Sequence, residues 1–414
     1  MKSGLLVVVG LLVLSGGLLA ADSLRVTKVA TYVGEIDYAY ALAVEGDFAY
    51  IADHDRGMRV LHISNVEQPR EVGIYATRSE NHCIDVKKGR AYLGSLSSGF
   101  HVIDVTNPTQ PTRLGNLRDP NPRGVAVSGD YAYLATEYDG LLVIDITDER
   151  HPTQVGDHDI DGYCFGLAVN DSFAFVAAEI GLFVIDISDP THPFRIAEYV
   201  NRNNAANITL SENLAHVAYW NAGVGIVNIE NPADPVEIES YGRIGYIQNV
   251  AVSGSHLYAS AGTGGFYVFD ISNPRAIRRV GFYNTAGSVS DIAVLPDGKI
   301  IVADSSNVGI YDCSEALSVP SVLPFILHPS SLILSSYPNP FNSSTTISYS
   351  LPKPGRYALD VVDIKGRLVT RLSDGWREAG SYRANWHGVA PAGTYYLKLG
   401  MTNELHTQSV TLIK

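Results

Sequence analysis

The chain has 414 residues, 46% of them hydrophobic, which is enough to bury the cores of two domains. Its formal net charge of −13 argues against nucleic acid as a partner, because proteins that bind nucleic acid in general are basic. Cys83, Cys164 and Cys313 are too few and too scattered for a disulfide framework, so we interpret them as small buried side chains.

The first 21 residues have the pattern of a signal peptide. Lys2 supplies a basic start, residues 5–14 are apolar, and Ala20 and Ala21 are small residues suited to cleavage. The apolar stretch is shorter than the roughly 20 residues of an ordinary membrane helix, although an uncleaved anchor is the alternative. We therefore expect residues 1–21 to direct export.

A repeat fills residues 22–315. The residue at the aspartate position of "GLFVIDIS" recurs at His62, Asp104, Asp145, Asp186, Asn228, Asp270 and Asp312. Successive positions are 41 or 42 residues apart, which is the length of one four-stranded propeller blade. Each copy holds strand patterns separated by Gly, Asn, Asp and Pro. The sequence therefore predicts an all-β fold with a seven-bladed β-propeller.

The two ends of this array are out of phase with the blades. Residues 25–33 resemble the fourth, outer strand of a copy, whereas the seventh copy ends after its third strand at 308–314. Pairing the two segments would close the ring and leave no free strand edge at the junction. We expect this closure.

The copies resemble the LVIVD-repeat family, whose fold is propeller-like. The resemblance implies an extracytoplasmic setting and no settled set of catalytic residues. The repeated aspartate is replaced by His62 and Asn228 in two copies. We therefore expect it to organise the turn between the third and fourth strands rather than to carry chemistry.

The segments in which the copies differ are those that surround one mouth of a propeller's central channel. They precede the first strand of each blade or join its second and third strands, where a binding site would be grafted. The candidate ligand-binding residues are Tyr40, His82, Arg123, Glu137, Phe165, Glu179, Trp220 and Gln248. This mixture suits a glycan or a peptide or protein ligand, and a solvated rim without a ligand is the alternative.

One acidic loop is a candidate calcium site. Asp157, Asp159 and Asp161 alternate before Gly162, as at the start of a calcium-binding loop. Ala168 stands where the helix–loop–helix motif requires glutamate, so an exposed acidic turn is the alternative. Calcium is the single cofactor that the sequence suggests.

A different pattern begins after residues 316–334, which we interpret as a linker. Residues 335–414 alternate as strands of a small β-sandwich. The motifs at 337–341 ("YPNPF"), 366–369 ("GRLV") and 393–396 ("GTYY") resemble the type A C-terminal sorting domain of the type IX secretion system, which is immunoglobulin-like in shape. His387 departs from the aspartate that is usual there.

The resemblance implies that the outer-membrane secretion machinery is a partner of residues 335–414, and that the protein is secreted or on the surface of a Gram-negative bacterium. A carbohydrate-binding or spacer sandwich is the alternative. For the propeller we expect a non-enzymatic binding or structural module. The alternative is a lyase or hydrolase of surface polysaccharide that uses His82, Arg123 and Glu137. A converging cluster with perturbed proton affinities would favour the enzyme.

Overall fold

The computed structural model describes most of the chain. Described are residues 23–200, 204–242, 244–318, 333–337, 344–351, 355–377, 380–387, 390–401 and 404–412. They belong to two compact units, one within residues 1–321 and one within 322–414. The predicted signal peptide lies outside the described residues. Across those ranges, no helix is long and apolar enough to cross a membrane.

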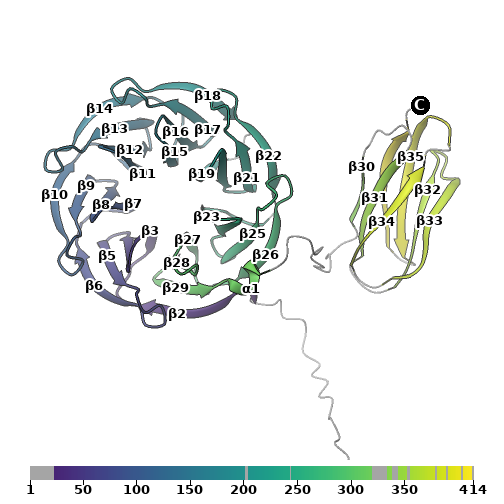
Figure 1. The fold of residues 1–414 in the computed structure, drawn as a ribbon, viewed down its shortest axis with the longest axis horizontal. Coiled ribbons are helices and arrows are strands. Elements are labelled where there is room, and N and C mark those ends of the chain that lie inside the picture. Colours follow the sequence, from purple (N-terminus) through teal and green to yellow (C-terminus); the bar gives the residue numbers. More distant parts are fainter. Residues whose placement is uncertain are drawn as a thin grey trace, which may run out of the picture. The chain divides into compact units, whose positions relative to one another are not determined.

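Seven antiparallel sheets stand around a ring in the first unit (Figure 1). The strands nearest the axis are β3 (Ala39–Glu45), β7 (Asn81–Lys87), β11 (Pro122–Ser128), β15 (Cys164–Val169), β19 (Ala205–Ser211), β23 (Asn249–Ser253) and β27 (Val289–Val294). The second strands are β4 (Phe48–Asp53), β8 (Arg90–Ser95), β12 (Tyr131–Thr136), β16 (Phe173–Ala178), β20 (Leu214–Tyr219), β24 (His256–Ser260) and β28 (Ile300–Asp304).

The two outer layers of the ring complete each blade. The third strands are β5 (Gly57–His62), β9 (Gly99–Asp104), β13 (Leu141–Asp145), β17 (Gly181–Asp186), β21 (Gly223–Asn228), β25 (Phe266–Asp270) and β29 (Asn307–Asp312). The outermost strands are β6 (Arg70–Tyr75), β10 (Thr112–Leu117), β14 (Thr153–His158), β18 (Phe194–Val200), β22 (Val236–Tyr241), β26 (Arg278–Tyr283) and β2 (Thr27–Val33). The predicted all-β, seven-bladed propeller is confirmed.

The third strands are apolar because both of their faces are covered by neighbouring blades. In β17, Phe183 is 1% exposed and Val184 is fully buried. Cys83, Cys164 and Cys313 are buried free thiols, as the sequence predicts. Burying these side chains on both faces supplies the hydrophobic stabilisation that holds adjacent blades together.

The repeated aspartate shapes the turn after the third strand in the copies that contain it. Asp104 Oδ1 accepts hydrogen bonds from the backbone N–H of Thr106 at 2.9 Å and from its hydroxyl at 2.6 Å. Asp145 binds Thr147 in the same way, and Asp186 binds Ser188. The bonds from Thr106 lower the pKa of Asp104. The structure thus confirms a turn-forming role.

The ring is closed by strands from both ends of the array. β2 pairs antiparallel with β29, from Thr27 opposite Asp312 to Val33 opposite Asn307, as the sequence predicts. A two-residue strand, β1 (Ser23–Leu24), also pairs with β26 of the preceding blade. Residues 23–33 therefore pair with both the seventh and the sixth blade.

A short helix, α1 (Ser314–Leu317), follows β29. Its Ala316 is fully buried in the core formed by the last two blades. The sequence interpretation started the linker at residue 316. The buried Ala316 instead shows that the propeller continues through α1.

The second unit consists of two sheets. One has the order β30 (Ile333–Tyr337), β31 (Ser344–Leu351) and β34 (Gly380–His387). The other has the order β33 (Leu368–Arg377), β32 (Gly355–Val362), β35 (Gly393–Met401) and β36 (Glu404–Leu412). Both sheets contribute to one buried core, with Ile347 and Trp386 from the first and Leu359 and Leu397 from the second. The unit therefore has its own core, and its immunoglobulin-like shape stays a prediction.

Candidate binding site at the mouth of the central channel

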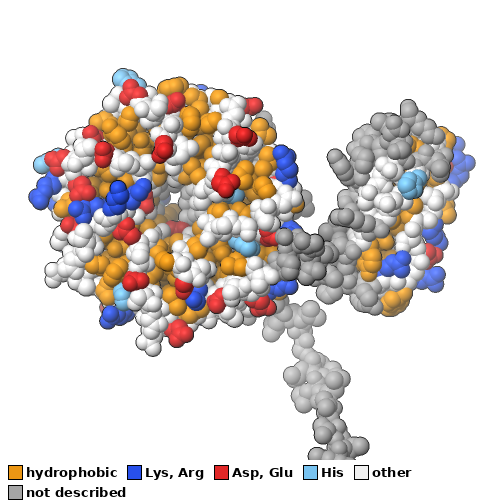
Figure 2. Space-filling view, viewed as in Figure 1, with side chains coloured by type: hydrophobic (Ala, Val, Ile, Leu, Met, Phe, Trp, Pro, Cys, Tyr) orange, Lys and Arg blue, Asp and Glu red, His pale blue; other side chains and the backbone are white. Residues whose placement is uncertain are grey.

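A cavity of about 990 Å³ occupies the centre of the ring. All seven innermost strands contribute to its wall, and Figure 2 shows the face of the ring hollowed near its middle. Six of the predicted ligand-binding residues line it: Tyr40, His82, Arg123, Phe165, Trp220 and Gln248. Glu137 and Glu179 lie outside the cavity wall. Glu137 forms an ion pair with Arg123, and Glu179 is exposed in the loop after β16.

A β-bulge places one residue of most blades at the mouth. In β3 the register shifts between Ala39 and Ala41, so Tyr40 has no partner in the ladder. The same shift frees His82 in β7, Arg123 in β11 and Phe165 in β15. A bulge re-aims the side chain of its extra residue, so the fold presents these side chains to the cavity without breaking the blade.

The residues from blades one to three form a polar arc, which we define as Tyr40, His54, His82, Arg123 and Glu137. The Tyr40 and His82 rings are 4.2 Å apart between centroids, and those of His54 and His82 are 5.5 Å apart. Arg123 forms an ion pair with Glu137, with its Nη2 2.5 Å from Oε1. Its Nη1 lies 3.0 Å from Nδ1 of His82. These side chains converge.

Burial and charge shift the pKa values of His82 and Tyr40. The pKa of His82 is lowered to about 3, first by burial and then by the positive charge of Arg123 and by His54. Burial also raises the pKa of Tyr40, against the opposing effect of Arg123. Near neutral pH, His82 is therefore an uncharged imidazole and Tyr40 a protonated phenol.

An aromatic arc begins in the third blade and continues over the following ones; we define it as Tyr138, Tyr163, Phe165, Trp220 and Tyr246. Successive ring centroids are 5.4, 6.3, 4.4 and 5.4 Å apart. Tyr138 is 65% exposed and Tyr246 41%. Phe165, Trp220 and Tyr246 line the central cavity, whereas Tyr138 borders the smaller depression described below. A row of partly exposed rings suits stacking against a ligand that carries both apolar and polar groups.

A buried carboxylate lies in the wall of the channel. Asp291 in β27 accepts hydrogen bonds from the N–H of Leu42 at 2.7 Å, from the N–H of Ile292 at 2.7 Å, and from the Asn249 amide. Burial raises its pKa to about 7, and the three hydrogen bonds act in the opposite direction. Asp291 thus ties the last blade to the first and to the preceding one.

The residues of the cavity wall that sequence reasoning missed include His54, Tyr246, Asn249 and Asp291. His54 lies in a loop between a second and a third strand, and the sequence predicts such loops at the mouth, so this histidine was a usable signal. Asp291 carried another signal, because a carboxylate is unexpected inside a strand of small and β-branched residues.

The three aspartates of the predicted calcium loop are exposed. Asp157 and Asp159 border a smaller depression of about 480 Å³ together with Asp119 and Asp139. Gln154 donates a hydrogen bond of 3.4 Å to Asp157. Calcium binding by Asp157, Asp159 and Asp161 stays a prediction.

The closed ring of seven four-stranded blades around a lined cavity defines the first unit as a β-propeller. Among solved structures, the WD40 β-propeller domain of Doa1 matches with a TM-score of 0.58 at 12% identity, over 70% of this chain and 97% of that one. The computationally designed Ika8 protein matches with a TM-score of 0.53 at 13% identity, over 69% and 99%. At such identities the likeness concerns the fold alone.

The chain belongs to the LVIVD-repeat family. The family model, described as LVIVD repeat, matches residues 37–77, 83–119, 121–159, 161–200, 203–242 and 244–285. A second model, described as secretion system C-terminal sorting domain, matches residues 335–414. A comparison with curated proteins found no match. The sorting domain indicates an exported protein, secreted or on the cell surface, that engages type IX secretion machinery.

Proposed function

We propose that this protein is an exported, non-enzymatic binding module that takes a glycan at the mouth of its propeller. The observation that carries the proposal is that three rings of the aromatic arc, Phe165, Trp220 and Tyr246, line the same cavity as Tyr40, His82 and Arg123. Sugar rings have apolar faces and polar edges. The aromatic rings would take the faces, while Arg123 and Gln248 would bind hydroxyls or carboxylates at the edges.

Delivery is assigned to the C-terminal unit. A signal peptide at residues 1–21 would bring the chain to the periplasm, and residues 335–414 would engage the outer-membrane secretion machinery. The core of this unit is separate from that of the propeller, which fits a sorting domain that folds without the binding module. The expected location is the surface or surroundings of a Gram-negative bacterium.

A glycan array probed with the full mature chain tests the binding proposal. We expect a restricted set of glycans to bind, and Tyr246→Ala to weaken binding by about tenfold, because Tyr246 lines the cavity and its stacking surface is lost. Phe194→Ala is the matched control, since Phe194 is 54% exposed on an outer strand away from the mouth. Equal binding by both variants, or hits confined to a peptide array, would reject the glycan proposal.

A second candidate is a polysaccharide lyase or hydrolase. Its supporting observation is that Tyr40, His82 and Arg123 converge and that the pKa values of Tyr40 and His82 are shifted. The two candidates separate on turnover. Glycans that bind are incubated with the protein and assayed for new reducing ends and for unsaturated ends. Product formation that Arg123→Ala abolishes would establish the enzyme, and binding without product supports the non-enzymatic module.

A further inference from the structure

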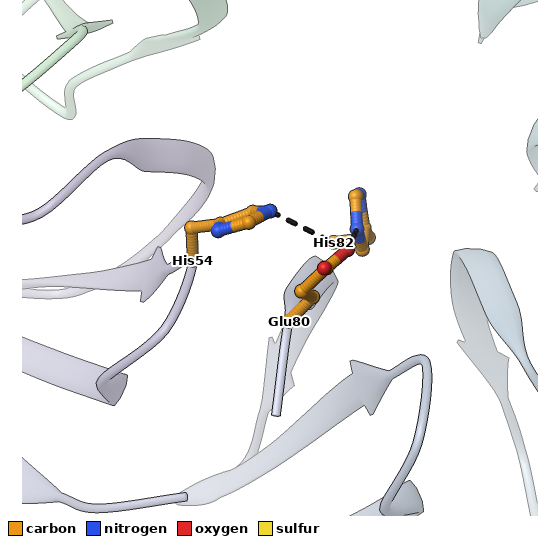
Figure 3. Close-up of side chains that lie close together, drawn as sticks. All are labelled: His54, Glu80 and His82. Carbon is orange, nitrogen blue, oxygen red and sulfur yellow. Dashed lines mark hydrogen bonds and ion pairs between the residues drawn. The ribbon is translucent and has the colours of Figure 1, made fainter. Parts of the chain in front are cut away.

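Two histidines and a glutamate meet where the first blade joins the second (Figure 3). His54 begins the loop after β4, Glu80 directly precedes β7, and His82 is the bulged residue of β7. Asn81 donates both its backbone N–H and its side-chain amide to the carbonyl of His54, each at 2.8 Å. These bonds pin the two segments together, so the three side chains are brought together by the scaffold itself.

The distances from Glu80 to each histidine fit one small cation, and the three ligand atoms all lie within 4.8 Å of one another. Nε2 of His54 is 3.5 Å from Oε2 of Glu80, and Nε2 of His82 is 3.4 Å from the same oxygen. In a tetrahedral site with metal–ligand bonds of about 2.0–2.1 Å, ligand atoms are about 3.3 Å apart. Glu80 is half exposed, which leaves its side chain room to approach an ion.

The orientation of the His54 ring also matches that of a metal ligand. Its Nδ1 lies 3.3 Å from Oδ1 of Asp55. A proton on Nδ1 satisfies this carboxylate and leaves the lone pair on Nε2, the nitrogen that faces Glu80. Metal-binding histidines almost always donate their other N–H to a carboxylate, a carbonyl or water, which fixes the ring.

Arg123 leaves the ring nitrogens of His82 accessible in the plane of the ring. Its Nη1 is 3.0 Å from Nδ1 and 3.4 Å from Nε2. A group that lies almost equally close to both nitrogens sits over the ring face, not on the in-plane lone pair of one of them. Guanidinium groups commonly stack on rings in this way. The charge of Arg123 is balanced by Glu137, so Glu80 is available to an added cation.

We propose that His54 Nε2, Glu80 Oε2 and His82 Nε2 bind one divalent ion of the zinc class. Two imidazoles and one carboxylate form a zinc ligand set that leaves a fourth position open. His54 and His82 line the central cavity, so the open position faces it, and a hydroxyl or carboxylate oxygen of a bound molecule would complete the coordination. The site goes beyond the proposed function, because it would bind the ion with or without a glycan.

Isothermal titration of the full mature chain with zinc chloride, after dialysis against a chelator, tests the proposal. We expect one ion per chain, and roughly 100-fold or greater loss of affinity in His54→Ala and in Glu80→Gln. Asp55→Asn should weaken binding by about 10- to 100-fold through the orientation of His54. Cobalt in place of zinc should give the visible absorption of a tetrahedral site. Thermal melts confirm that each variant is folded.

Two controls sharpen the test. His192→Ala removes an exposed histidine that pairs with Asp189 in a surface turn, and it should leave zinc affinity unchanged. Asp37→Asn tests the neighbouring group of Asp37, His54 and Asp55, which shares one histidine with the proposed site. The proposal is overturned if the wild type binds no zinc, if Glu80→Gln binds as tightly as the wild type, or if Asp37→Asn causes the loss in its place.

Discussion

The polar arc and the aromatic arc follow each other around the ring, yet they differ in chemical character. Tyr40, His82, Arg123 and Phe165 all sit at the same bulge of the first strand. His82 contacts the ring of Tyr40 on one side and the guanidinium of Arg123 on the other. Phe165 instead packs against Trp220. The bulge therefore fixes the position at which a side chain enters the mouth, whereas the type of residue at that position varies between blades.

Opening the ring should disrupt both arcs, because each of them is held in place by blades of the closed ring. Deleting residues 23–33 removes β1 and β2 and exposes the edge of β29. We expect loss of cooperative thermal unfolding, or aggregation, measured by calorimetry and light scattering. A chain that starts at residue 23 is the control. An unchanged melting temperature after the deletion would contradict a role for closure in stability.

Trp220→Ala should disrupt the aromatic arc alone. Its ring lies 4.4 Å from that of Phe165 and 5.4 Å from that of Tyr246, and the side chain is partly buried. We expect a loss of about 2 kcal/mol in the free energy of unfolding, less than for a fully buried tryptophan. Trp376→Ala, at a position 66% exposed in the second unit, should change little. Chemical denaturation measures both.

Arg123→Ala should disturb the polar arc and lower the free energy of unfolding by about 1–2 kcal/mol, because Glu137 loses its ion-pair partner in a partly buried position. The same change should raise the pKa of His82, because the charge of Arg123 is one cause of its depression. Titration of the imidazole by NMR measures this shift. The pKa should remain below the ordinary value, since burial is the larger cause. An unmoved pKa would show that the charge of Arg123 does not reach the ring.

The pH dependence of stability tests the junction between the last and the first blade, which Asp291 joins through the N–H of Leu42. The pKa of Asp291 is 3.8 in the reference state and about 7 in the fold, so the folded state binds the proton more tightly. This contribution to stability is complete below pH 3.8 and is lost as the pH rises through about 7. Asp291→Asn should flatten the fall in melting temperature with pH, and the exposed Asp171→Asn should not.

Calcium is expected to have the smallest effect. If Asp157, Asp159 and Asp161 bind it, added calcium should raise the melting temperature by binding the native state. Asp159→Ala should remove that rise while leaving the arcs intact. A melting temperature that does not respond to calcium in the wild type rejects the site.

The regular period and the offset from the apolar third strand placed Tyr40, His82, Arg123, Phe165 and Gln248 at the position that lines the cavity, whereas Glu137 and Glu179 lie outside its wall. The sequence did not predict the bulges, since a bulge is a shift of register between two strands and neither strand encodes it alone. The role of Asp291 was also missed. Its donor, the N–H of Leu42, is 249 positions away in sequence and meets it only when the ring closes.

The bulges also have a consequence for engineering and for evolution. Each extruded residue lies outside the ladder of hydrogen bonds, so exchanging it alters the cavity wall while leaving the hairpin pairing in place. Randomising Tyr40, Arg123 and Phe165 together would produce a combinatorial library of mouths on one backbone. Natural paralogues could diversify by the same route, through a few point mutations and without insertions or deletions.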